Sequence, residues 1–202
     1  VYLENQYFSS SVVGAALEAR LREVAGPEVV VVSRLTEEGW LEERTMGLLR
    51  ARLHQRIRAA DAHGRYRLFY PHVPELEGAQ PLNVHSKVLI VDDELCSVGS
   101  ANFNNRSMGF DTECNMAIAA HGEERVKRAI AGLRRRLLAE HLGVRPEELA
   151  RAEDGSLVRT IEALRRPGRT LKPLEPQASA DLDRILPASA LLDPERPADP
   201  EM

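Results

Sequence analysis

The stretch that decides the fold runs from Val84 to Glu113 and reads VHSKVLIVDDELCSVGSANFNNRSMGFDTE. Its first part, Lys87 to Val91, is apolar and β-branched apart from the lysine, which is typical of a strand buried on both faces. After the turn Asp92-Asp93-Glu94, a second short strand from Leu95 to Val98 is expected to end at Gly99. The pattern predicts two adjoining strands of a buried sheet.

Polar side chains suited to phosphate chemistry accompany these strands. Side chains alternate between the two faces of an extended strand, so His85 and Lys87 are expected on the same side. An ionised lysine in a buried strand needs a partner, because an unpaired buried charge is costly, and a phosphate would supply one. Ser100 and Asn102 offer further hydrogen bonds to phosphoryl oxygens. A carboxylate at Glu113 that accepts a hydrogen bond from Nδ1 of His85 would leave Nε2 free to react.

These residues resemble the signature of a known family. His85-x-Lys87-(x)4-Asp92-(x)6-Gly99-Ser100-x-Asn102 matches the H-x-K-x(4)-D-x(6)-G-S-x-N pattern of the phospholipase D superfamily at every fixed position. The segment Asn104 to Glu113 looks like the phospholipase D branch more than the cardiolipin synthase or nuclease branches. The opening VYLENQYF, Val1 to Phe8, is similar to the strand that begins the second half of two-motif phospholipases D. The resemblance extends from Val1 to about Leu142.

The resemblance implies a metal-independent mechanism through a covalent phosphohistidine, with no cofactor and no metal ion. One histidine attacks the phosphorus, and a second histidine, from another copy of the motif, protonates the leaving alcohol. His85 would be one of that pair, and Glu113 would orient it. The residues expected to hold the phosphate are Lys87, Ser100 and Asn102. The remaining signature residues, Asp92 and Gly99, are expected to have structural roles.

The polar triplet near the amino terminus has two interpretations. Glu4, Asn5 and Gln6 follow a predicted strand, where polar residues commonly serve turns. The family likeness instead makes them candidates for the rim of the active site. Tyr7 and Phe8 are expected to belong to the core.

The chain contains a single H-x-K motif, so a second catalytic histidine must come from elsewhere. No lysine stands two positions after any of the other histidines, which are His54, His63, His72, His121 and His141. Either two copies of the chain meet across a twofold axis, or the chain is the C-terminal half of a longer two-motif enzyme. The second alternative is favoured, because the chain starts without Met in a strand that resembles mid-protein sequence.

Composition indicates one globular unit with a tail. At 202 residues and 43% hydrophobic content, the chain can bury one good core. The net charge of −4 resides in residues 170–202, which hold three Lys or Arg against seven Asp or Glu, together with six of the twelve prolines. We therefore expect a phospholipase D-like catalytic half-domain over residues 1–142, a C-terminal helical extension over 143–169, and a disordered or linker tail over 170–202.

The coarse order of elements predicts an α/β fold with a mixed β-sheet flanked by helices. Helices are expected at Val12–Val24, Trp40–Ala60 and Glu123–His141. Strands are expected at Val1–Leu3, Glu28–Ser33, Tyr66–Phe69, Asn83–Val91, Leu95–Val98 and Glu113–Ala119.

Cysteine usage and hydropathy bear on location. Two cysteines, Cys96 and Cys114, provide no disulfide framework and fit a reducing compartment. No apolar run approaches 18 residues, so this stretch is not expected to span a membrane. A cytoplasmic or peripheral membrane location is predicted.

The arginine-rich segment from Arg34 to Arg67 also has two interpretations. Eight arginines against five acids suit an ordinary exposed helix with intrahelical ion pairs. The alternative is attraction to anionic lipid head groups at a membrane surface. Nucleic acid is disfavoured as a partner, because aromatic content is only 4% and no stacking platform is visible.

The sequence predicts a phosphodiesterase that hydrolyses the head-group phosphodiester of phospholipids or transfers it to an alcohol. Three alternatives remain. These are a cardiolipin-synthase-like phosphatidyltransferase, a metal-independent nuclease, and a non-catalytic interaction module. The expected partners are a phospholipid substrate and a second motif, from a missing N-terminal half or a homodimer partner.

Overall fold

The computed structural model describes residues 1–36, 40–176 and 193–194. Its strands are β1 (Tyr2–Asn5), β2 (Val29–Val32), β3 (Tyr66–His72), β4 (Lys87–Val91), β5 (Leu95–Gly99), β6 (Asn115–Ala119) and β7 (Thr170–Pro173). Its helices are α1 (Ser11–Arg22), α2 (Trp40–Ala60), α3 (Asn105–Gly109), α4 (Glu124–Leu142), α5 (Pro146–Ala152) and α6 (Leu157–Leu164), with a 3-10 turn, η1 (Pro74–Leu76).

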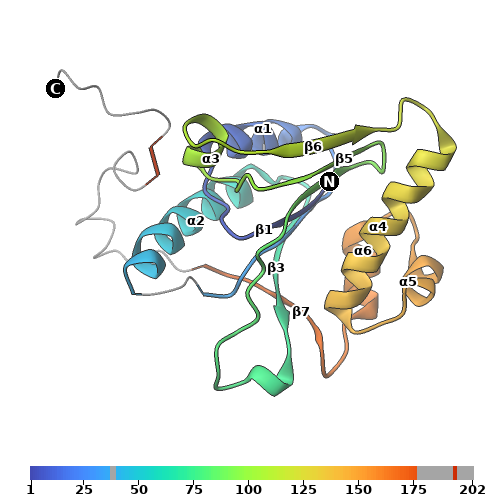
Figure 1. Cartoon of the computed structure of the whole chain (residues 1–202). Coiled ribbons are helices and arrows are strands. Elements are labelled where there is room, and N and C mark those ends of the chain that lie inside the picture. The colour runs from blue at the N-terminus through green and yellow to red at the C-terminus, as the bar shows by residue number, and fades with distance from the viewer. Residues whose placement is uncertain (37–39, 177–192, 195–202) are drawn as a thin grey trace.

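A seven-stranded mixed sheet forms the centre of the molecule (Figure 1), in the order β6-β5-β4-β1-β2-β3-β7. The strands β1, β2 and β3 are parallel and are joined through α1 and α2. The other neighbouring pairs are antiparallel. The predicted α/β fold with a mixed sheet flanked by helices is confirmed.

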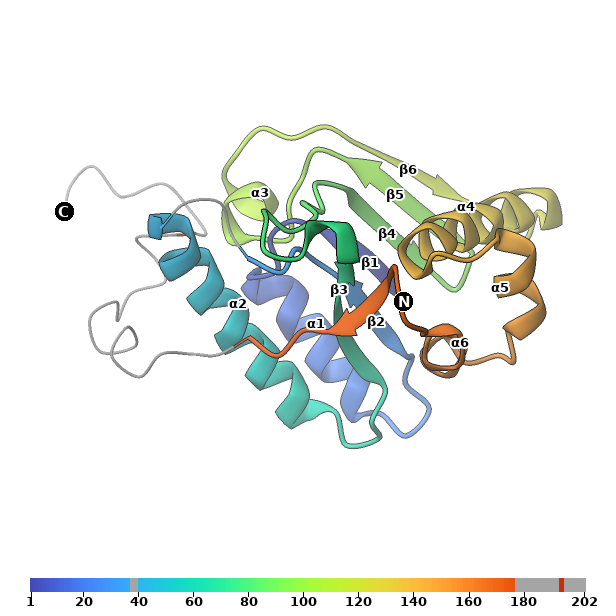
Figure 2. The same cartoon turned by 90° about the horizontal axis from the view of Figure 1, so that it is seen from below.

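Helices cover both faces of the central strands (Figure 2). β2 shows why, because its four consecutive valines are all fully buried. Val30 and Val32 face a core that α4, α5 and α6 complete, whereas Val29 and Val31 face a core completed by α1 and α2. A continuous run of valines is what a strand between two helical layers requires.

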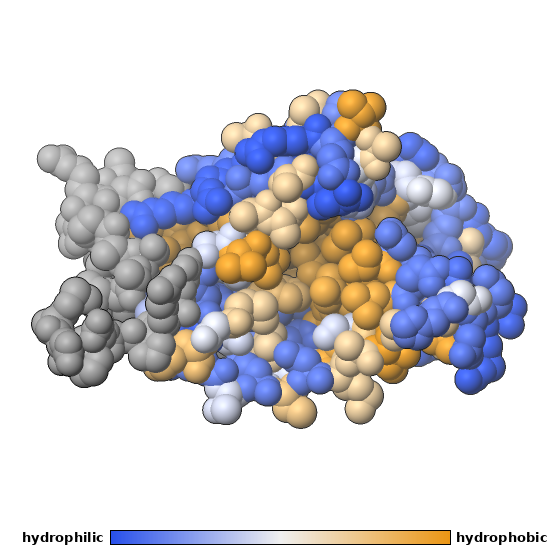
Figure 3. Space-filling view, turned by 90° about the horizontal axis from the view of Figure 1, so that it is seen from above, coloured by the Kyte–Doolittle hydropathy of each residue, from blue (hydrophilic) through white to orange (hydrophobic). Residues whose placement is uncertain are grey.

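The sheet ends in an exposed edge strand at β6. All five residues of β6 are exposed, and Met116 and Ile118 are 69% and 47% exposed. Val98 on the neighbouring strand pairs with Met116 and is 44% exposed. Seen from above the view of Figure 1, the surface also gathers apolar side chains at its centre, between hydrophilic flanks (Figure 3). Part of the sheet surface is therefore apolar and open.

The turn between β4 and β5 has left-handed backbone at two successive residues. Asp92 and Asp93 have φ angles of 53° and 55°, and the Glu94 amide donates to the carbonyl of Val91 at 2.9 Å. Such a turn matches the twist of the strands that it joins, and Asp tolerates it better than most residues. Asp93 also accepts two hydrogen bonds of 2.8 Å from Arg134 of α4. The signature aspartate thus stands in a tight turn that is anchored to a helix.

A buried carboxylate links β1 to α4. Glu4 is only 2% exposed and accepts hydrogen bonds from Tyr2, from Ser86 Oγ at 2.6 Å and from His141 Nε2 at 3.0 Å. Burial acts to raise the pKa of Glu4, but the hydrogen bonds from His141, Ser86 and Tyr2 outweigh it and hold the pKa below its ordinary value. The ionised carboxylate is therefore part of the folded structure.

The structure differs from the expected elements at several ends. β4 begins at Lys87 and β6 at Asn115, later than predicted, because the preceding residues lack sheet pairing. The predicted tail boundary at residue 170 is wrong, since β7 pairs with β3 and buries Leu171 completely. The extension before it contains α5 and α6. Most of the predicted tail, 177–192 and 195–202, lies outside the described residues.

One residue of the predicted tail is buried within the fold. Asp193 is 1% exposed and accepts a hydrogen bond from Ser9 Oγ at 2.8 Å. It also accepts backbone hydrogen bonds of 2.9 Å from Asn105 and Arg106 at the start of α3.

No helix within the described residues has both the length and the apolar character needed to cross a membrane.

We expect Glu4→Gln to lower the free energy of unfolding by about 1–3 kcal/mol near neutral pH, because the glutamine cannot replace the charged acceptor. The folded pKa of Glu4 is depressed, so its stabilising contribution is present above the unfolded pKa and is lost as pH falls through the folded pKa. The difference in free energy of unfolding between wild type and Glu4→Gln should therefore become smaller in acid. Urea unfolding across a pH series measures it.

Glu162→Gln is the matched control, because the Glu162 side chain is 42% exposed and pairs with Arg165 on the surface. It should change the free energy of unfolding by under about 1 kcal/mol. A Glu4→Gln difference that stays constant into acid would contradict the role given to the ionised carboxylate.

Candidate active site

The signature residues other than Asp92, which stands in the turn at the far end of β4, gather at one edge of the sheet. β4 runs antiparallel to β1 and β5, and β5 runs antiparallel to β6. The start of β4 therefore lies beside the ends of β1 and β5, and the end of β5 lies beside the start of β6. The register shows this directly, because Asn5 pairs with Lys87 and Gly99 pairs with Asn115.

Lys87 provides a buried positive charge at this edge. It is 9% exposed, and its Nζ donates to Gln6 Oε1 at 3.1 Å and to the carbonyl of His85 at 2.8 Å. Burial lowers the pKa of Lys87, the charge of Glu113 raises it, and Arg34 lowers it further, with a net lowering. An ammonium held by neutral acceptors in this way can still gain from an anionic ligand.

His85 lies just before β4, and its side chain is exposed. Its ring makes no hydrogen bond or ion pair with any other residue in the described ranges 1–36, 40–176 and 193–194. An accessible imidazole close to a buried ammonium suits attack on a phosphorus atom or protonation of a leaving group. The hydrogen bond from His85 to Glu113 stays a prediction.

Ser100 and Glu113 form a hydrogen-bonded pair where β5 ends and β6 begins. Ser100 Oγ donates to Glu113 Oε2 at 2.5 Å, and the Cys114 amide donates to Ser100 Oγ at 3.0 Å. The backbone of Ser100 also pairs with Cys114, its amide donating to the carbonyl at 3.0 Å. The serine hydroxyl is thus held at the entrance of β6, next to the carboxylate.

Gly99 allows this close approach of β5 to β6. A Cβ atom at this position would lie 1.9 Å from Asn115 Oδ1 and 2.4 Å from the carbonyl oxygen of Cys114. Both distances are far below van der Waals contact, so any side chain would push the strands apart. The glycine of the signature therefore has a steric reason, and Asn115 Oδ1 uses the space to accept from the Ala101 amide at 3.3 Å.

Asn102 lines an open cavity of about 420 Å³ together with Glu113. Its Oδ1 is buried and has no hydrogen-bond partner in the described structure. The remaining lining residues are Tyr7, Met46, Asn104, Arg106, Ser107 and Asp111. Arg106 is paired with Asp111 at 2.9 Å. Asn102 of the signature and Glu113 therefore line one cavity, which has room for part of a substrate.

The triplet Glu4, Asn5 and Gln6 is buried behind the signature, with exposed fractions of 2%, 0% and 7%. Glu4 binds Ser86, and Gln6 binds Lys87. Asn5 Oδ1 accepts from the Phe103 amide at 3.0 Å. The family likeness made these residues candidates for the rim of the active site. The structure buries them instead, and each side chain binds a residue of the motif segments or of the loop that follows. Phe8 is in the core as expected, whereas Tyr7 is half-buried and lines the cavity.

The other histidines do not join this site. His141 binds Glu4 and His54 lies 3.1 Å from the Tyr66 hydroxyl, both within the core. His72 lies 3.3 Å from the carboxylate of Glu77. His63 and His121 are exposed in turns. The described residues include all six histidines, so this chain brings one imidazole to the signature.

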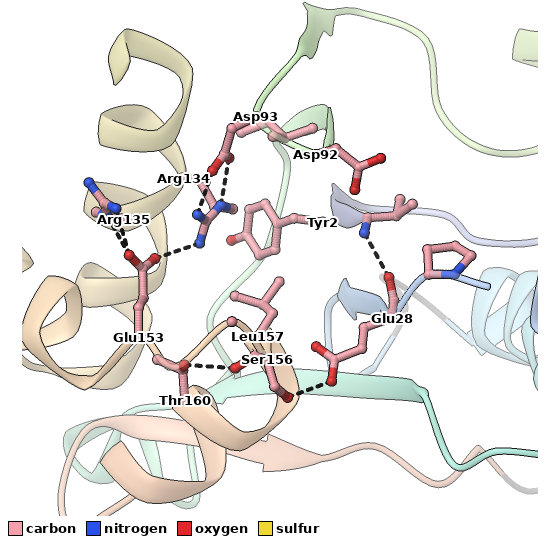
Figure 4. Close-up of a pocket in the computed structure, with 14 residues that line it drawn as sticks. Tyr2, Glu28, Asp92, Asp93, Arg134, Arg135, Glu153, Ser156, Leu157 and Thr160 are labelled. Carbon is pink, nitrogen blue, oxygen red and sulfur yellow. Dashed lines mark hydrogen bonds and ion pairs between the residues drawn. The ribbon is translucent and has the colours of Figure 1, made fainter. Parts of the chain in front are cut away.

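A second cavity, of about 460 Å³, lies away from most signature residues (Figure 4). Among its lining residues, Arg134 pairs with Asp93 and Glu153, and Arg135 pairs with Glu153. Ser156 donates to Glu28. Its arginines thus bind carboxylates of the same wall, so the cavity provides a weaker anion site than the edge around Lys87.

Two residues beside the signature went unassigned in the sequence interpretation. Ser86 lies between His85 and Lys87, and its side chain binds Glu4. Asn115 supports the loop after Gly99. Their only sequence signal is proximity to the signature. The partners of both residues depend on which strands become neighbours.

Comparison with known proteins identifies the family. A family model described as Phospholipase D matches residues 76–171. Phospholipase D alpha 1 of Cynara cardunculus is 35% identical over 114 residues, which is 54% of this chain and 14% of that protein. Phospholipase D of Phytophthora infestans is 29% identical over 204 residues, covering 77% of this chain and 11% of that protein. The chain thus spans about a seventh or less of these relatives.

Among solved structures, NucT from Helicobacter pylori overlaps with a TM-score of 0.42 at 14% identity. The overlap covers 67% of this chain and 77% of NucT. The family match and the named relatives are independent of this loose overlap. They agree with the signature assembled at the sheet edge, and the chain belongs to the phospholipase D superfamily.

Proposed function

We propose that this chain supplies one half of the active site of a phosphodiesterase that acts on phospholipid head groups through a phosphohistidine. The observation that carries the proposal is the buried ammonium of Lys87, which binds the backbone carbonyl of His85 and is acted on by the charge of Glu113; the His85 residue itself is exposed. Membership of the phospholipase D superfamily and the names of the relatives support a phosphodiesterase at the family level.

The proposed chemistry divides one displacement into two. Nε2 of one histidine attacks phosphorus, the bond to the leaving alcohol breaks, and the second histidine gives its proton to that alcohol. The second histidine then deprotonates a water or an acceptor alcohol, which attacks phosphorus and breaks the P–N bond. In this proposal Lys87, Ser100 and the side-chain amide of Asn102 stabilise the charge on the phosphoryl oxygens.

Glu113 has two roles open to it in this scheme. Its carboxylate accepts from Ser100 and raises the pKa of Lys87, which keeps the ammonium charged against the effect of burial. An orienting hydrogen bond to His85 would require the exposed ring to turn toward it when the site is complete. We propose that Glu113 keeps Lys87 charged in this chain and that it also orients His85 once the second H-x-K unit has joined the site.

The second histidine comes from another H-x-K unit, in a longer chain or in a second copy. The exposed apolar surface beside the site is consistent with binding of such a unit. It includes Val98, Met116 and Ile118 on the adjoining strands β5 and β6. Open apolar surface next to an incomplete site is a surface that association can bury. A phospholipid substrate also places the enzyme at a membrane surface, at least transiently.

Two related activities use the same residues. A phosphatidyltransferase of the cardiolipin synthase kind would differ in the acceptor, so product analysis with phosphatidylglycerol and glycerol separates it from hydrolysis. A nuclease would release nucleotides from single-stranded DNA. Within α2, Arg50, Arg56 and Arg58 bind Leu35, Glu18 and Glu175 of this chain, so these charges are engaged within the fold and do not by themselves favour nucleic acid.

We expect His85→Ala and Lys87→Ala, each in the complete enzyme, to lower kcat by roughly 10³-fold or more while the fold survives. Both side chains act on the phosphoryl group, and His85 is exposed. Assays on phosphatidylcholine vesicles with circular dichroism of the same samples measure activity and fold together. A stable and fully active His85→Ala enzyme would sink the assignment.

The matched controls are two variants of Asp92, whose φ of 53° favours glycine. Asp92→Ala should lose stability before it loses chemistry, by about 1 kcal/mol, because alanine tolerates this backbone less well. Asp92→Gly should stay close to wild type in stability. If Asp92→Gly removed activity without any loss of stability, the aspartate would belong to the chemistry rather than to the turn.

We expect activity to survive EDTA, because every group in the proposed mechanism is a protein side chain. Turnover measured before and after dialysis against EDTA should agree. Loss of turnover that Zn²⁺ or Ca²⁺ restores would show that a metal ion takes part, and the mechanism would have to be replaced.

Turnover should require two H-x-K units. An imidazole bonded to phosphorus cannot also serve as acid or base, so an isolated monomer of residues 1–202 should be inactive on phosphodiesters. Activity should require a dimer or the addition of a second H-x-K unit. Light scattering with an assay at the same protein concentration decides this, and robust metal-independent turnover by a strict monomer would refute the two-histidine mechanism.

A further inference from the structure

We propose that Glu4, Asn5 and Gln6 are positioning residues, which hold the H-x-K and G-S-x-N parts of the active site in place from behind. The proposal rests on the proposed function and adds three residues that do not touch the substrate. All three are consecutive and buried at the carboxyl end of β1. Each one binds a different part of the signature.

Gln6 fixes the ammonium of Lys87. Its Oε1 accepts from Nζ at 3.1 Å, and its own carbonyl accepts from Ser33 Oγ at 3.2 Å. The Lys87 ammonium has a second bond, to the carbonyl of His85 at 2.8 Å. These two acceptors define the position of the charge.

Asn5 fixes the loop that carries Asn102. Its Oδ1 accepts from the Phe103 amide at 3.0 Å, and its Nδ2 donates to the carbonyl of Ala101 at 3.5 Å. The two bonds flank Asn102 on both sides. The carbonyl of Phe103 in turn accepts the amides of Ser9 and Ser10 at 2.8 Å each, ahead of α1. The loop is therefore tied to β1 and to the start of a helix.

Glu4 fixes the residue between His85 and Lys87. Its Oε2 accepts from Ser86 Oγ at 2.6 Å, and its Oε1 is held by Tyr2 and His141. Ser86 precedes β4, where no strand pairing holds the backbone. The serine bond thus restrains the segment from which the exposed imidazole projects.

Supporting hydrogen bonds of this kind act on rate because small displacements of a catalytic group are costly. Removing a residue that orients a catalytic or metal-binding side chain typically costs 10-fold to 100-fold in function. We therefore expect kcat of Gln6→Met, Asn5→Leu and Ser86→Ala, each in the complete enzyme, to fall roughly 10-fold to 100-fold, with KM nearly unchanged. Ser97→Ala, a change on β5 outside these bonds, should leave kcat unchanged.

The titration of Lys87 gives a reading that a purely structural role would not change. The charged groups that act on Lys87 are Glu113 and Arg34, and neither is altered in these variants. Gln6→Met removes a hydrogen bond to the charged form, so the pKa of Lys87 should fall below its wild-type value. Gln6→Glu replaces the amide that binds Lys87 Nζ by a carboxylate, so the pKa of Lys87 should rise. The chain has only three lysines, Lys87, Lys127 and Lys172, so ¹³Cε-lysine NMR can follow Lys87 directly.

Asn5→Asp provides a conservative rescue, because it keeps the oxygen that accepts from Phe103. It should recover most of the activity that Asn5→Leu loses. Unfolding midpoints measured on every variant separate loss of fold from loss of positioning. If some variant fails to fold, the opposed shifts of Gln6→Met and Gln6→Glu still test the proposal.

The outcomes distinguish this proposal from the proposed function. Opposite shifts of the Lys87 titration together with a fall in kcat at constant KM support positioning. Equal or absent shifts for the two Gln6 variants, or unchanged kcat in folded Gln6→Met and Asn5→Leu, overturn it. A wild-type enzyme with no phosphodiesterase activity would overturn the proposed function instead, and the Lys87 titration would then decide positioning by itself.

Discussion

Buried polar groups at the carboxyl end of β1 must find hydrogen-bond partners, and the rest of the site depends on where those partners lie. Glu4, Asn5 and Gln6 are nearly inaccessible to water, and an unsatisfied polar group there would cost about 1–3 kcal/mol. The partners come from the start of β4 and from the loop after β5. The hydrogen bonds that satisfy these three buried side chains are therefore the same bonds that hold the signature segments in position.

The sheet order makes this possible. β1 is one of two strands where parallel pairing meets antiparallel pairing, because it pairs with β2 on one side and with β4 on the other; β3 is the second such strand. The end of β1 consequently lies beside the beginning of β4 rather than the end. A parallel neighbour would have placed Lys87 at the opposite edge, far from Gln6.

Positive charge is balanced differently around the cavity that Arg134 lines and at the sheet edge around Lys87. Around Arg134 the cations bind carboxylates within the same wall, which stabilises the packing of α4 on the β4–β5 turn. At the sheet edge Lys87 is bound by an amide and a carbonyl, both neutral, with Glu113 acting on it only through its charge. The second arrangement leaves electrostatic attraction available for an anion, which is the reason to place the chemistry there.

Much of the architecture followed from local pattern. The valine run of β2, the helix over Trp40–Ala60 and the strand pair around the Asp92 turn all have strong local signals, and the structure places them as expected. β7 was missed because its four residues include a lysine and a proline, which resemble a linker more than a strand. Only pairing with β3 makes it part of the sheet, and pairing partners are not encoded locally.

For the site itself, the sequence determined which residue types are present and how they are spaced, because the signature is contiguous and each fixed position has a chemical or steric reason. It also determined that one chain offers one H-x-K motif. Only the tertiary structure decided that Glu4, Asn5 and Gln6 lie behind the signature and that Ser100 binds Glu113. The physical reason is that hydrogen-bond partners across a sheet depend on register and burial, which arise only when strands distant in sequence become neighbours.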